Sequence, residues 1–388
     1  MSRSTPFKSK FERYSPHLTQ IFYSDNKKVL TGETYEFLLD RHGDFVHRIY
    51  LQVDYTPEES ASFNQGHLLI DYVDLLVGDT IVQRETHKTL YMKMITSEGR
   101  NGAFDSTSNG MNYLLGGLDF QDVEKYPRPY TLNIPLTFYF FGEDKLALPL
   151  CALGLQEVKI RVKFNSKSRY IVDPQTEVDE LTTRLRIEYG YVPLAVRKEF
   201  MSKRLDYVMD EVQVVQHTTQ GGGVVMVKDV NIINPVKGLV FEYQDSGRVV
   251  SDPFNFTRKS YPSSLQRDFV KNISVVIGNN ELATSRSCTK DFMRTSQFHS
   301  GYDGGPRLDI NSVYYAINFC PKPHDKTPTS YVSFSQSTTN ILVDLEFPYS
   351  YQLTGSVAVG TIYAISINVL RIENGMLTKL WSNPFTSL

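Results

Sequence analysis

The stretch of residues 130–164 constrains the fold of this chain more than any other. It opens with an aromatic-rich segment at 132–141, turns at 142–144 and continues through an apolar run at 146–155. Residues 158–164 then alternate apolar and basic side chains, which is the period of a strand with one buried and one solvated face. No catalytic group is prominent in this stretch, so we interpret it as architecture.

Short strands of the same character recur along the whole chain. Tyr and Phe number 24 and 23 against a single Trp, and aromatic residues, with Val, Ile and Thr, favour β structure. Short strands without long helices between them predict an all-β sandwich or barrel. The predicted strands are 35–39, 45–55, 67–77, 80–83, 90–95, 132–141, 158–164, 181–192, 208–216, 224–233, 238–243, 270–277, 312–319, 331–334, 340–347 and 360–372.

The length of the chain favours two domains. A single hydrophobic core stops growing at roughly 250–300 residues, and this chain has 388. The best helical segment begins at 194, and its charged residues favour a solvated connector over a helix that binds nucleic acid. We therefore expect an N-terminal arm at 1–30, a first domain with the helical connector at 31–205, and a second domain at 206–388.

The two halves follow the same order of segments. The strands 157–164 and 183–192 of the first half correspond to 340–347 and 363–372 of the second. Residue identity between the halves is poor, but order and spacing agree. We interpret the chain as a tandem duplication of one eight-stranded antiparallel unit. A double-sheet unit of this kind is a jelly roll, so a double jelly roll is predicted.

The sequence carries no motif for chemistry. It has no Gly-x-Ser-x-Gly nucleophile elbow, no phosphate-binding or dinucleotide-binding glycine loop and no His-x-His spacing. Three widely spaced cysteines indicate neither a zinc site nor a disulfide framework. The carboxylate pairs Asp71/Asp74 and Glu143/Asp144 are interpreted as solvated charges. We expect no catalytic, cofactor-binding or metal-binding residue, and no enzyme.

Charge and hydropathy narrow the possible partners. The net charge is −2, so no global basic field exists to bind nucleic acid. The polar, basic N-terminus lacks the apolar core of a secretory signal. The longest uncharged apolar run, 146–155, is far shorter than the ~20 residues that cross a bilayer. We therefore expect a soluble protein that is not secreted by the usual route.

Four short groups of residues occur in the same order along the chain as the landmarks of a known family. They are RHGDFV at 41–46, LALPLCAL at 146–153 followed by EVKI at 157–160, YGYV at 189–192 with 197–213, and VLRI at 369–372 with GM at 375–376 and SN at 382–383. Together they resemble landmarks of the major capsid proteins of nucleocytoplasmic large DNA viruses, the double jelly-roll capsid family. The segment 328–335 departs from that family's pattern, because it lacks a glycine that the family tends to have there.

The resemblance implies a viral structural protein with no enzymatic activity and no cofactor. It implies a homotrimer, in which six jelly rolls form a pseudo-hexameric capsomer, and an icosahedral shell tiled by such capsomers. The implied partners are neighbouring capsomers and minor capsid and penton proteins, without direct sequence-specific binding of nucleic acid. The implied location is the virion capsid, assembled in the host cytoplasm.

The ends of the rolls are expected to face opposite sides of the shell. We expect the arm, with Lys8, Lys10 and Arg13, to face inwards and contact an internal membrane or a minor capsid protein, and a frayed tail is the alternative. The loops 97–126 and 285–311 are expected to form the outer surface, because long connections collect at one end of a sandwich. For the whole chain, the alternatives are a minor capsid paralogue of the same fold and a carbohydrate-binding β-sandwich module.

Overall fold

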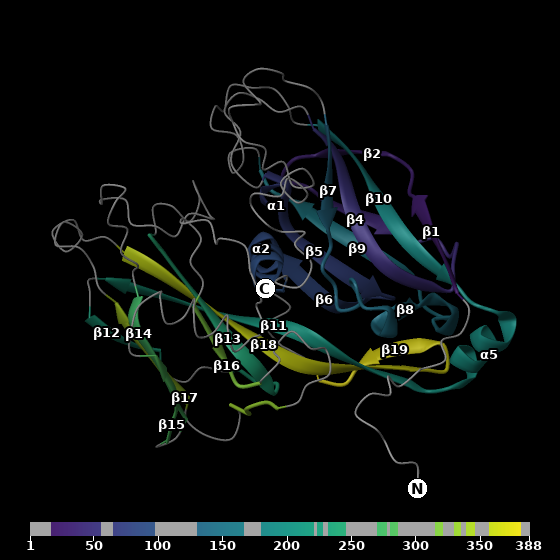
Figure 1. The fold of residues 1–388 in the computed structure, drawn as a ribbon. Coiled ribbons are helices and arrows are strands. Elements are labelled where there is room, and N and C mark those ends of the chain that lie inside the picture. The colour runs from purple at the N-terminus through teal and green to yellow at the C-terminus, as the bar shows by residue number, and fades with distance from the viewer. Residues whose placement is uncertain are drawn as a thin grey trace, which may run out of the picture.

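The computed structural model describes residues 17–55, 65–97, 130–166, 180–220, 223–227, 232–245, 270–277, 280–285, 315–320, 330–334, 339–345 and 357–381. These residues form four antiparallel β-sheets with a few short helices (Figure 1). The helices are α1 (Gln65–Leu68), α2 (His87–Ser97) and α5 (Leu194–Ser202), with short 3-10 turns η1 (Asp144–Leu146) and η2 (Leu150–Ala152).

The first half of the chain contributes two of the sheets. One sheet has the order β1-β10-β4-β7, and the other has the order β3-β9-β5-β6. A short strand β2 pairs with β10, and β8 pairs with β4. The bounds are β1 (Leu18–Tyr23), β2 (Lys27–Leu30), β3 (Thr34–Leu38), β4 (Phe45–Tyr55), β5 (Ile70–Val77), β6 (Thr80–Thr86), β7 (Tyr130–Pro135), β8 (Leu148–Pro149), β9 (Val158–Phe164) and β10 (Glu180–Tyr191).

The second half contributes the other two sheets. Their orders are β11-β18-β13-β16 and β12-β17-β14-β15, and β19 pairs with β18. The bounds are β11 (Leu205–Gln220), β12 (Gly223–Val227), β13 (Val236–Asp245), β14 (Val270–Ile277), β15 (Asn280–Ser285), β16 (Tyr315–Asn318), β17 (Thr339–Leu345), β18 (Val357–Glu373) and β19 (Met376–Lys379).

The two halves repeat one topology. With the short strands β2, β8 and β19 set aside, one sheet of each half joins its first, eighth, third and sixth strands. The other sheet of each half joins its second, seventh, fourth and fifth strands. The predicted double jelly roll is therefore confirmed. The segments predicted to be equivalent, 157–164 with 340–347 and 183–192 with 363–372, contribute β9 with β17 and β10 with β18, which hold the same places in their sheets.

The period-two pattern of the sequence explains how the sandwich of each roll is filled. In β9, Val158, Ile160, Val162 and Phe164 are buried, and the basic residues between them are only half-buried. The same alternation runs through β10, with Leu181, Leu185 and Ile187 in the core. Burying one face of each strand removes apolar area from water and fixes the register, because a slip by one residue would turn the core face to solvent.

Part of the segment predicted as an arm, 1–30, is paired β structure. Leu18–Tyr23 and Lys27–Leu30 are strands β1 and β2, and both pair antiparallel with β10. Most residues of β1 are exposed, so this edge strand is held by backbone hydrogen bonds rather than by a buried face. It therefore leaves no apolar period in the sequence from which it could have been predicted. Residues 1–16, with Lys8, Lys10 and Arg13, lie outside the described residues.

The strand predicted at 90–95 is wrong, because these residues lie in helix α2. A short apolar run fits a buried strand and a buried helix equally well. Thr86 and Thr89 decide for the helix: the backbone N–H of each donates to the hydroxyl of the other, at 2.8 and 3.2 Å. Such reciprocal bonds satisfy amide groups that a helix start leaves free.

Two further predicted strands are wrong in extent. The strand predicted at 132–141 ends at Pro135, and the chain then turns, with the N–H of Phe138 donating to the carbonyl of Leu136 at 2.8 Å. The segment predicted at 331–334 forms only an isolated bridge between Val332 and Val236. The loops predicted at 97–126 and 285–311 lie outside the described residues except for their first residue.

Candidate assembly surfaces

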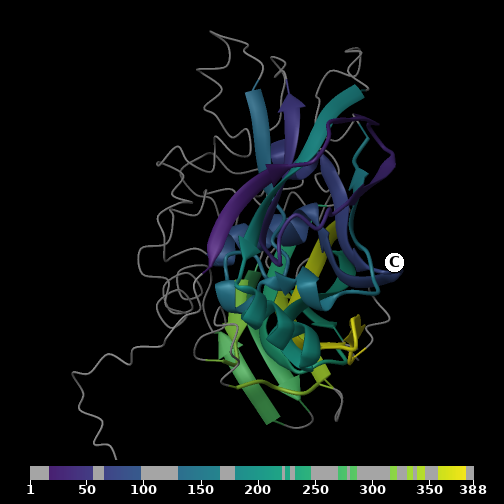
Figure 2. The same cartoon turned by 90° about the vertical axis from the view of Figure 1, so that its right-hand side faces the viewer.

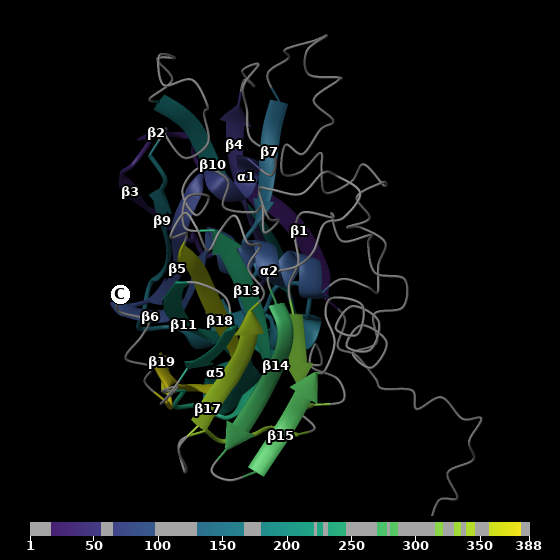
Figure 3. The ribbon, with the colours of Figure 1, turned by 90° about the vertical axis from the view of Figure 1, so that its left-hand side faces the viewer.

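The outer face of the sheet β11-β18-β13-β16 of the second roll packs against the first roll (Figure 3). Along β13, Leu239, Phe241 and Tyr243 belong to the core of the second roll. Val240, which lies between them, belongs instead to the hydrophobic cluster of the first roll, as does Tyr363 of β18. The two rolls therefore share a continuous apolar contact within one chain.

A buried ion pair lies at this contact. Nζ of Lys88, on α2 of the first roll, lies 2.5 Å from Oε1 of Glu242 on β13 of the second roll. The other carboxylate oxygen of Glu242 accepts a hydrogen bond of 2.5 Å from the hydroxyl of Tyr363. The Glu242 side chain is only 1% exposed. A buried carboxylate needs such partners, because an unpaired one would carry a large desolvation cost.

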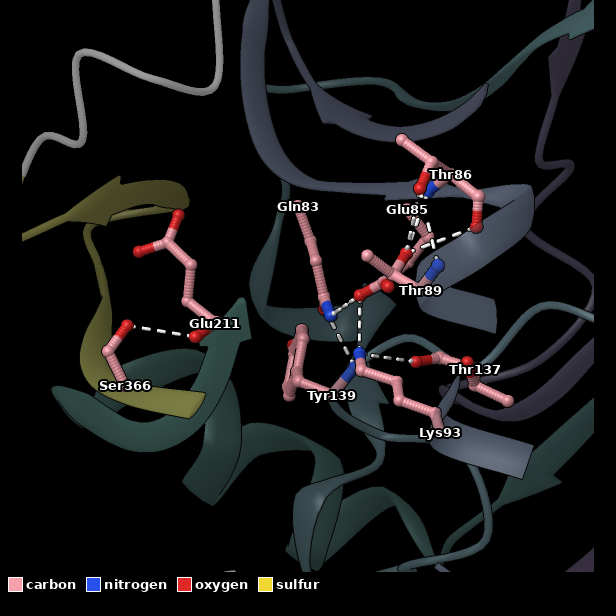
Figure 4. A network of polar contacts seen from close by, with 9 residues as sticks. All are labelled: Gln83, Glu85, Thr86, Thr89, Lys93, Thr137, Tyr139, Glu211 and Ser366. Carbon is pink, nitrogen blue, oxygen red and sulfur yellow. Dashed lines mark hydrogen bonds and ion pairs between the residues drawn. The ribbon is translucent and has the colours of Figure 1, made fainter. Parts of the chain in front are cut away.

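A polar network inside the first roll positions the residues at the contact (Figure 4). Gln83 and Glu85 of β6 are joined at 2.6 Å, and Lys93 of α2 forms an ion pair with Glu85. The backbone N–H of Tyr139 donates to Oε1 of Gln83 at 2.8 Å. The ring of Tyr139 lies 6.5 Å from that of Tyr207 on β11. The network thus holds α2 and Tyr139 in place against the second roll.

The closing strand of the chain is fixed by Glu211 of β11. Lys379 of β19 forms an ion pair with Glu211, and Asn368 and Asn234 donate to its other carboxylate oxygen at 2.8 and 3.1 Å. The hydroxyl of Ser366 donates to the backbone carbonyl of Glu211 at 2.8 Å, as Figure 4 also shows. β11, β18 and β19 are therefore locked into one unit beneath the first roll.

The turn before β19 also contacts the first roll directly. The N–H of Leu155 donates to the carbonyl of Gly375 at 3.1 Å, and the N–H of Leu377 donates to Oε1 of Gln156 at 2.6 Å. Gly375 has φ of +80°, a conformation that glycine adopts without strain. One backbone bond and one backbone-to-side-chain bond, between segments more than 200 residues apart, therefore tie the turn before β19 to the first roll.

The helical connector is docked by an ion pair. Nε of Arg197 on α5 lies 2.6 Å from Oδ1 of Asp44, which is 4% exposed, and the N–H of Val192 donates to the other oxygen at 3.0 Å. The ring of Phe200 packs edge-on against Phe45 at 5.0 Å. No residue of α5 is buried, which agrees with the prediction of a solvated connector.

Burial, full or partial, favours the neutral form of several titratable groups. Burial, with a smaller contribution from the neighbouring His87, lowers the pKa of His67 to about 3. Burial raises the pKa of the Cys151 thiol to about 11. Burial also raises the pKa of Tyr207 at the contact between the rolls. These shifts follow from the cost of placing charge in an apolar surrounding.

One member of the predicted pair Asp71/Asp74 differs from the prediction. Asp74 is fully buried and is bound by Arg84 in two-pronged fashion at 2.7 and 2.9 Å, so it is not a solvated charge. Its partner lies on the adjacent strand β6, a contact that sequence alone does not reveal. The prediction holds for Glu143 and Asp144, which are exposed, although Asp144 lies 3.1 Å from Nδ1 of His47.

The described ranges show neither a metal cage nor a membrane helix. No group of three or more His, Cys, Asp or Glu side chains in them is placed to hold a metal ion. None of their helices has both the length and the apolar character needed to cross a bilayer.

Exposed apolar side chains gather on edge strands. On β1, Leu18, Ile21 and Tyr23 are 64%, 43% and 53% exposed. On β12, an edge strand of the second roll, Val224 and Met226 are 68% and 46% exposed and point to the same face. Edge strands with exposed apolar side chains are places where further chains can pair or pack.

The family of the chain follows from its sequence match. The family model described as the N-terminus of major capsid proteins matches residues 5–208, slightly more than half of the chain. The chain belongs to the major capsid protein family. The fold agrees, because the matched region spans the whole first jelly roll and the connector α5. The resemblance noted from the four groups of residues is therefore confirmed.

Relatives and solved structures point to the same family. The chain is 23% identical over 361 residues to the major capsid protein of Pyramimonas orientalis virus, covering 89% of this chain and 85% of that protein. It resembles the PBCV-1 virus capsid with a TM-score of 0.77 at 16% identity, covering 98% of this chain and 100% of that one. The Faustovirus major capsid protein gives a TM-score of 0.66 at 10% identity, covering 96% and 93%. These solved structures support the double jelly-roll fold.

Proposed function

We propose that this capsid protein forms a homotrimer that serves as a pseudo-hexameric capsomer of an icosahedral shell. The observation that carries the proposal is the repetition of one strand order in both halves of the chain. A ring of three chains uses one heterologous contact three times and closes on itself. With two like rolls in each chain, the ring presents six similar sides to its neighbours.

The two rolls divide the chain at its connector. We propose that the first roll with its helical connector ends at residue 205 and that the second begins at 206, at the start of β11, which begins at Leu205. Lys203 and Arg204, between the last turn of α5 and β11, are exposed, as expected of a junction between domains.

The partners are other parts of a virion. Neighbouring capsomers contact one another weakly, and repetition over the shell makes those contacts sufficient. Minor capsid and penton proteins complete the shell, which assembles in the host cytoplasm. The basic residues Lys8, Lys10 and Arg13 face an internal membrane or a minor capsid protein. The role is structural rather than enzymatic, in line with relatives that are named capsid proteins.

Electron microscopy of the purified protein tests the proposal. Class averages should show three-fold blocks with a nearly hexagonal outline. Removal of residues 1–16 tests the arm separately: blocks should persist, and the truncated protein should fail to build closed shells together with its viral partners. Round or elongated monomeric particles at every concentration would contradict the capsomer, and closed shells from the truncated protein would contradict the arm's role.

A further inference from the structure

In the contact between the rolls, the second roll uses the outer face of a sheet that has an equivalent in the first roll. In the second roll, the outer face of the sheet β11-β18-β13-β16 carries Val240, Glu242 and Tyr363. All three are buried, and all three contact the first roll or belong to its cluster. Figures 1 and 3 show this sheet between α2 and the strands β14, β15 and β17.

The first roll has the matching sheet, β1-β10-β4-β7, with a very different outer face. On β4, Ile49, Leu51 and Val53 point into the core, so the residues between them point outwards. Those residues are Arg48, Tyr50 and Gln52, and they lie opposite Glu188, Arg186 and Arg184 of β10. In Figure 2 the purple, blue and teal strands of the first roll stand above the green strands of the second.

The outer face of this first-roll sheet is an ordered layer of arginine and tyrosine. The guanidinium of Arg186 lies over the ring of Tyr50 and that of Arg184 over the ring of Tyr23, each 4.8 Å from the ring centroid. Arg48 lies 3.0 Å from Glu188, and their side chains are 36% and 20% exposed. Ile21 and Tyr23 of β1 extend the face and are 43% and 53% exposed.

We infer that this face, the outer side of β1-β10-β4-β7, receives the second roll of a neighbouring copy of the same chain. The inference rests on the homotrimer proposed above. When six like rolls surround one axis, each roll contacts the next one around the ring in a similar way. Within one chain, the second roll uses the outer face of its sheet β11-β18-β13-β16 to contact the first roll. Between chains, the first roll then uses its equivalent face to contact the second roll of the neighbouring chain. The sheet face that the second roll buries inside the chain is therefore the face that the first roll buries between chains.

The difference in side chains fits the two kinds of contact. The contact inside the chain forms when the chain folds, and around Glu242 it is apolar with one ion pair. The face between chains keeps its half-buried Arg184, Arg186 and Tyr50 in contact with water until the trimer assembles. Arginine and tyrosine are enriched in protein interfaces and at their most important positions. Stacking holds the guanidinium groups ready for partners, so less side-chain entropy is lost on binding.

The second roll offers a matching residue for this face. In the first roll, the connection between β7 and β9 carries Tyr139, which packs near Tyr207 of the second roll. The equivalent connection of the second roll, between β16 and β17, carries Tyr331, which is 60% exposed. In the trimer, Tyr331 of one chain would lie against the arginine and tyrosine layer of the next.

Charge reversal tests the face. The variant Arg184→Glu/Arg186→Glu should lose the trimer, with a threefold fall in native mass by light scattering and an unchanged far-ultraviolet circular dichroism spectrum. The control Lys159→Glu reverses one charge on the outer side of β9, in the opposite sheet, and should keep the trimer. If the wild type is a trimer and the double variant is one too, the proposed face is wrong but the homotrimer stands. If the wild type is a monomer, both the homotrimer and the face are wrong.

Photo-crosslinking gives an answer that does not depend on how the charge-reversal variant folds. A benzophenone amino acid replaces Tyr23, and equal amounts of ¹⁴N and ¹⁵N protein are mixed, reassembled and irradiated. Mass spectrometry should find mixed-isotope peptides that join position 23 to residues after 206. The same probe at Lys159 should give none. Cross-links from position 23 only within one chain, or only to the first roll of another copy, would overturn the inference.

Discussion

Apart from the hydrogen bonds at the turn before β19, three side chains carry the polar part of the contact between the rolls. Lys88, Glu242 and Tyr363 come from α2, β13 and β18, and they meet beside apolar residues of both rolls. No motif in the sequence marks them, because they are far apart along the chain and meet only through the fold. The one available signal is the run of apolar residues in β13, which is typical of a strand that is buried on both faces.

Removal of the carboxylate should destabilise the folded chain strongly. Glu242→Ala leaves Lys88 buried without its partner, and loss of one member of a buried ion pair costs about 3–5 kcal/mol. The measurement is the midpoint of urea unfolding followed by fluorescence. Glu180→Ala is the matched control, because Glu180 pairs with Lys28 at an exposed site and its loss should barely move the midpoint. Equal shifts in the two variants would contradict the account.

Acid should destabilise the first roll through His67. Its pKa is about 3 in the folded chain and about 6.5 when unfolded, so only the unfolded state takes up the proton between these values. The titration of His67 therefore leaves the free energy of unfolding unchanged above pH 6.5 and lowers it as the pH drops towards 3. At pH 4.5 the loss is about 2–3 kcal/mol.

The variant His67→Phe isolates this effect. It keeps an aromatic ring next to Tyr91, 6.0 Å away in the native chain, and removes the titration. Its unfolding midpoint should fall less between pH 8 and pH 4.5 than that of the wild type, and comparison at pH 8 corrects for any change in packing. Parallel pH curves for the two proteins would show that His67 does not carry the acid sensitivity.

At the scale of elements, alternation was the reliable signal and its absence was the main source of error. β4, β9 and β10 were predicted closely, because each buries one apolar face while most residues of the other face are only half-buried. β1 was missed because it is an exposed edge strand, and α2 was misread because a short buried apolar run has no decisive period. The buried place of Asp74 was missed because its partner comes from another strand.

Close approach of strands in the second roll should make β18 intolerant of side chains at Gly360. A Cβ there would lie 2.6 Å from Cε1 of Tyr243 and closer still to the ring of His217. Gly360→Ala should lower stability by about 1–3 kcal/mol, as overpacking does. Thermal unfolding of Gly154→Ala is the comparison, because nothing lies within 4 Å of its added Cβ. A Gly360→Ala protein as stable as the control would show that β11 and β13 yield without cost.

At the scale of the whole molecule, the sequence revealed the repeat but not how the two rolls meet. Order and spacing sufficed for the repeat, since equivalent strands such as β9 and β17 recur at similar intervals. The contact between the rolls depends on residues from distant segments, such as Leu155 with Gly375 and Tyr139 with Tyr207, which no local pattern encodes. The assembly surfaces were unpredictable for the same reason, because a face is defined only once strands from different parts of the chain lie side by side.

The native mass of the purified protein tests the central claim most directly. Light scattering should give one species near three times 44.4 kDa, about 133 kDa, that persists on dilution. That result would support a closed trimer of double jelly rolls as the building block of the shell. A single species near 44 kDa at every concentration would contradict the proposed capsomer, while leaving the fold of the chain as described.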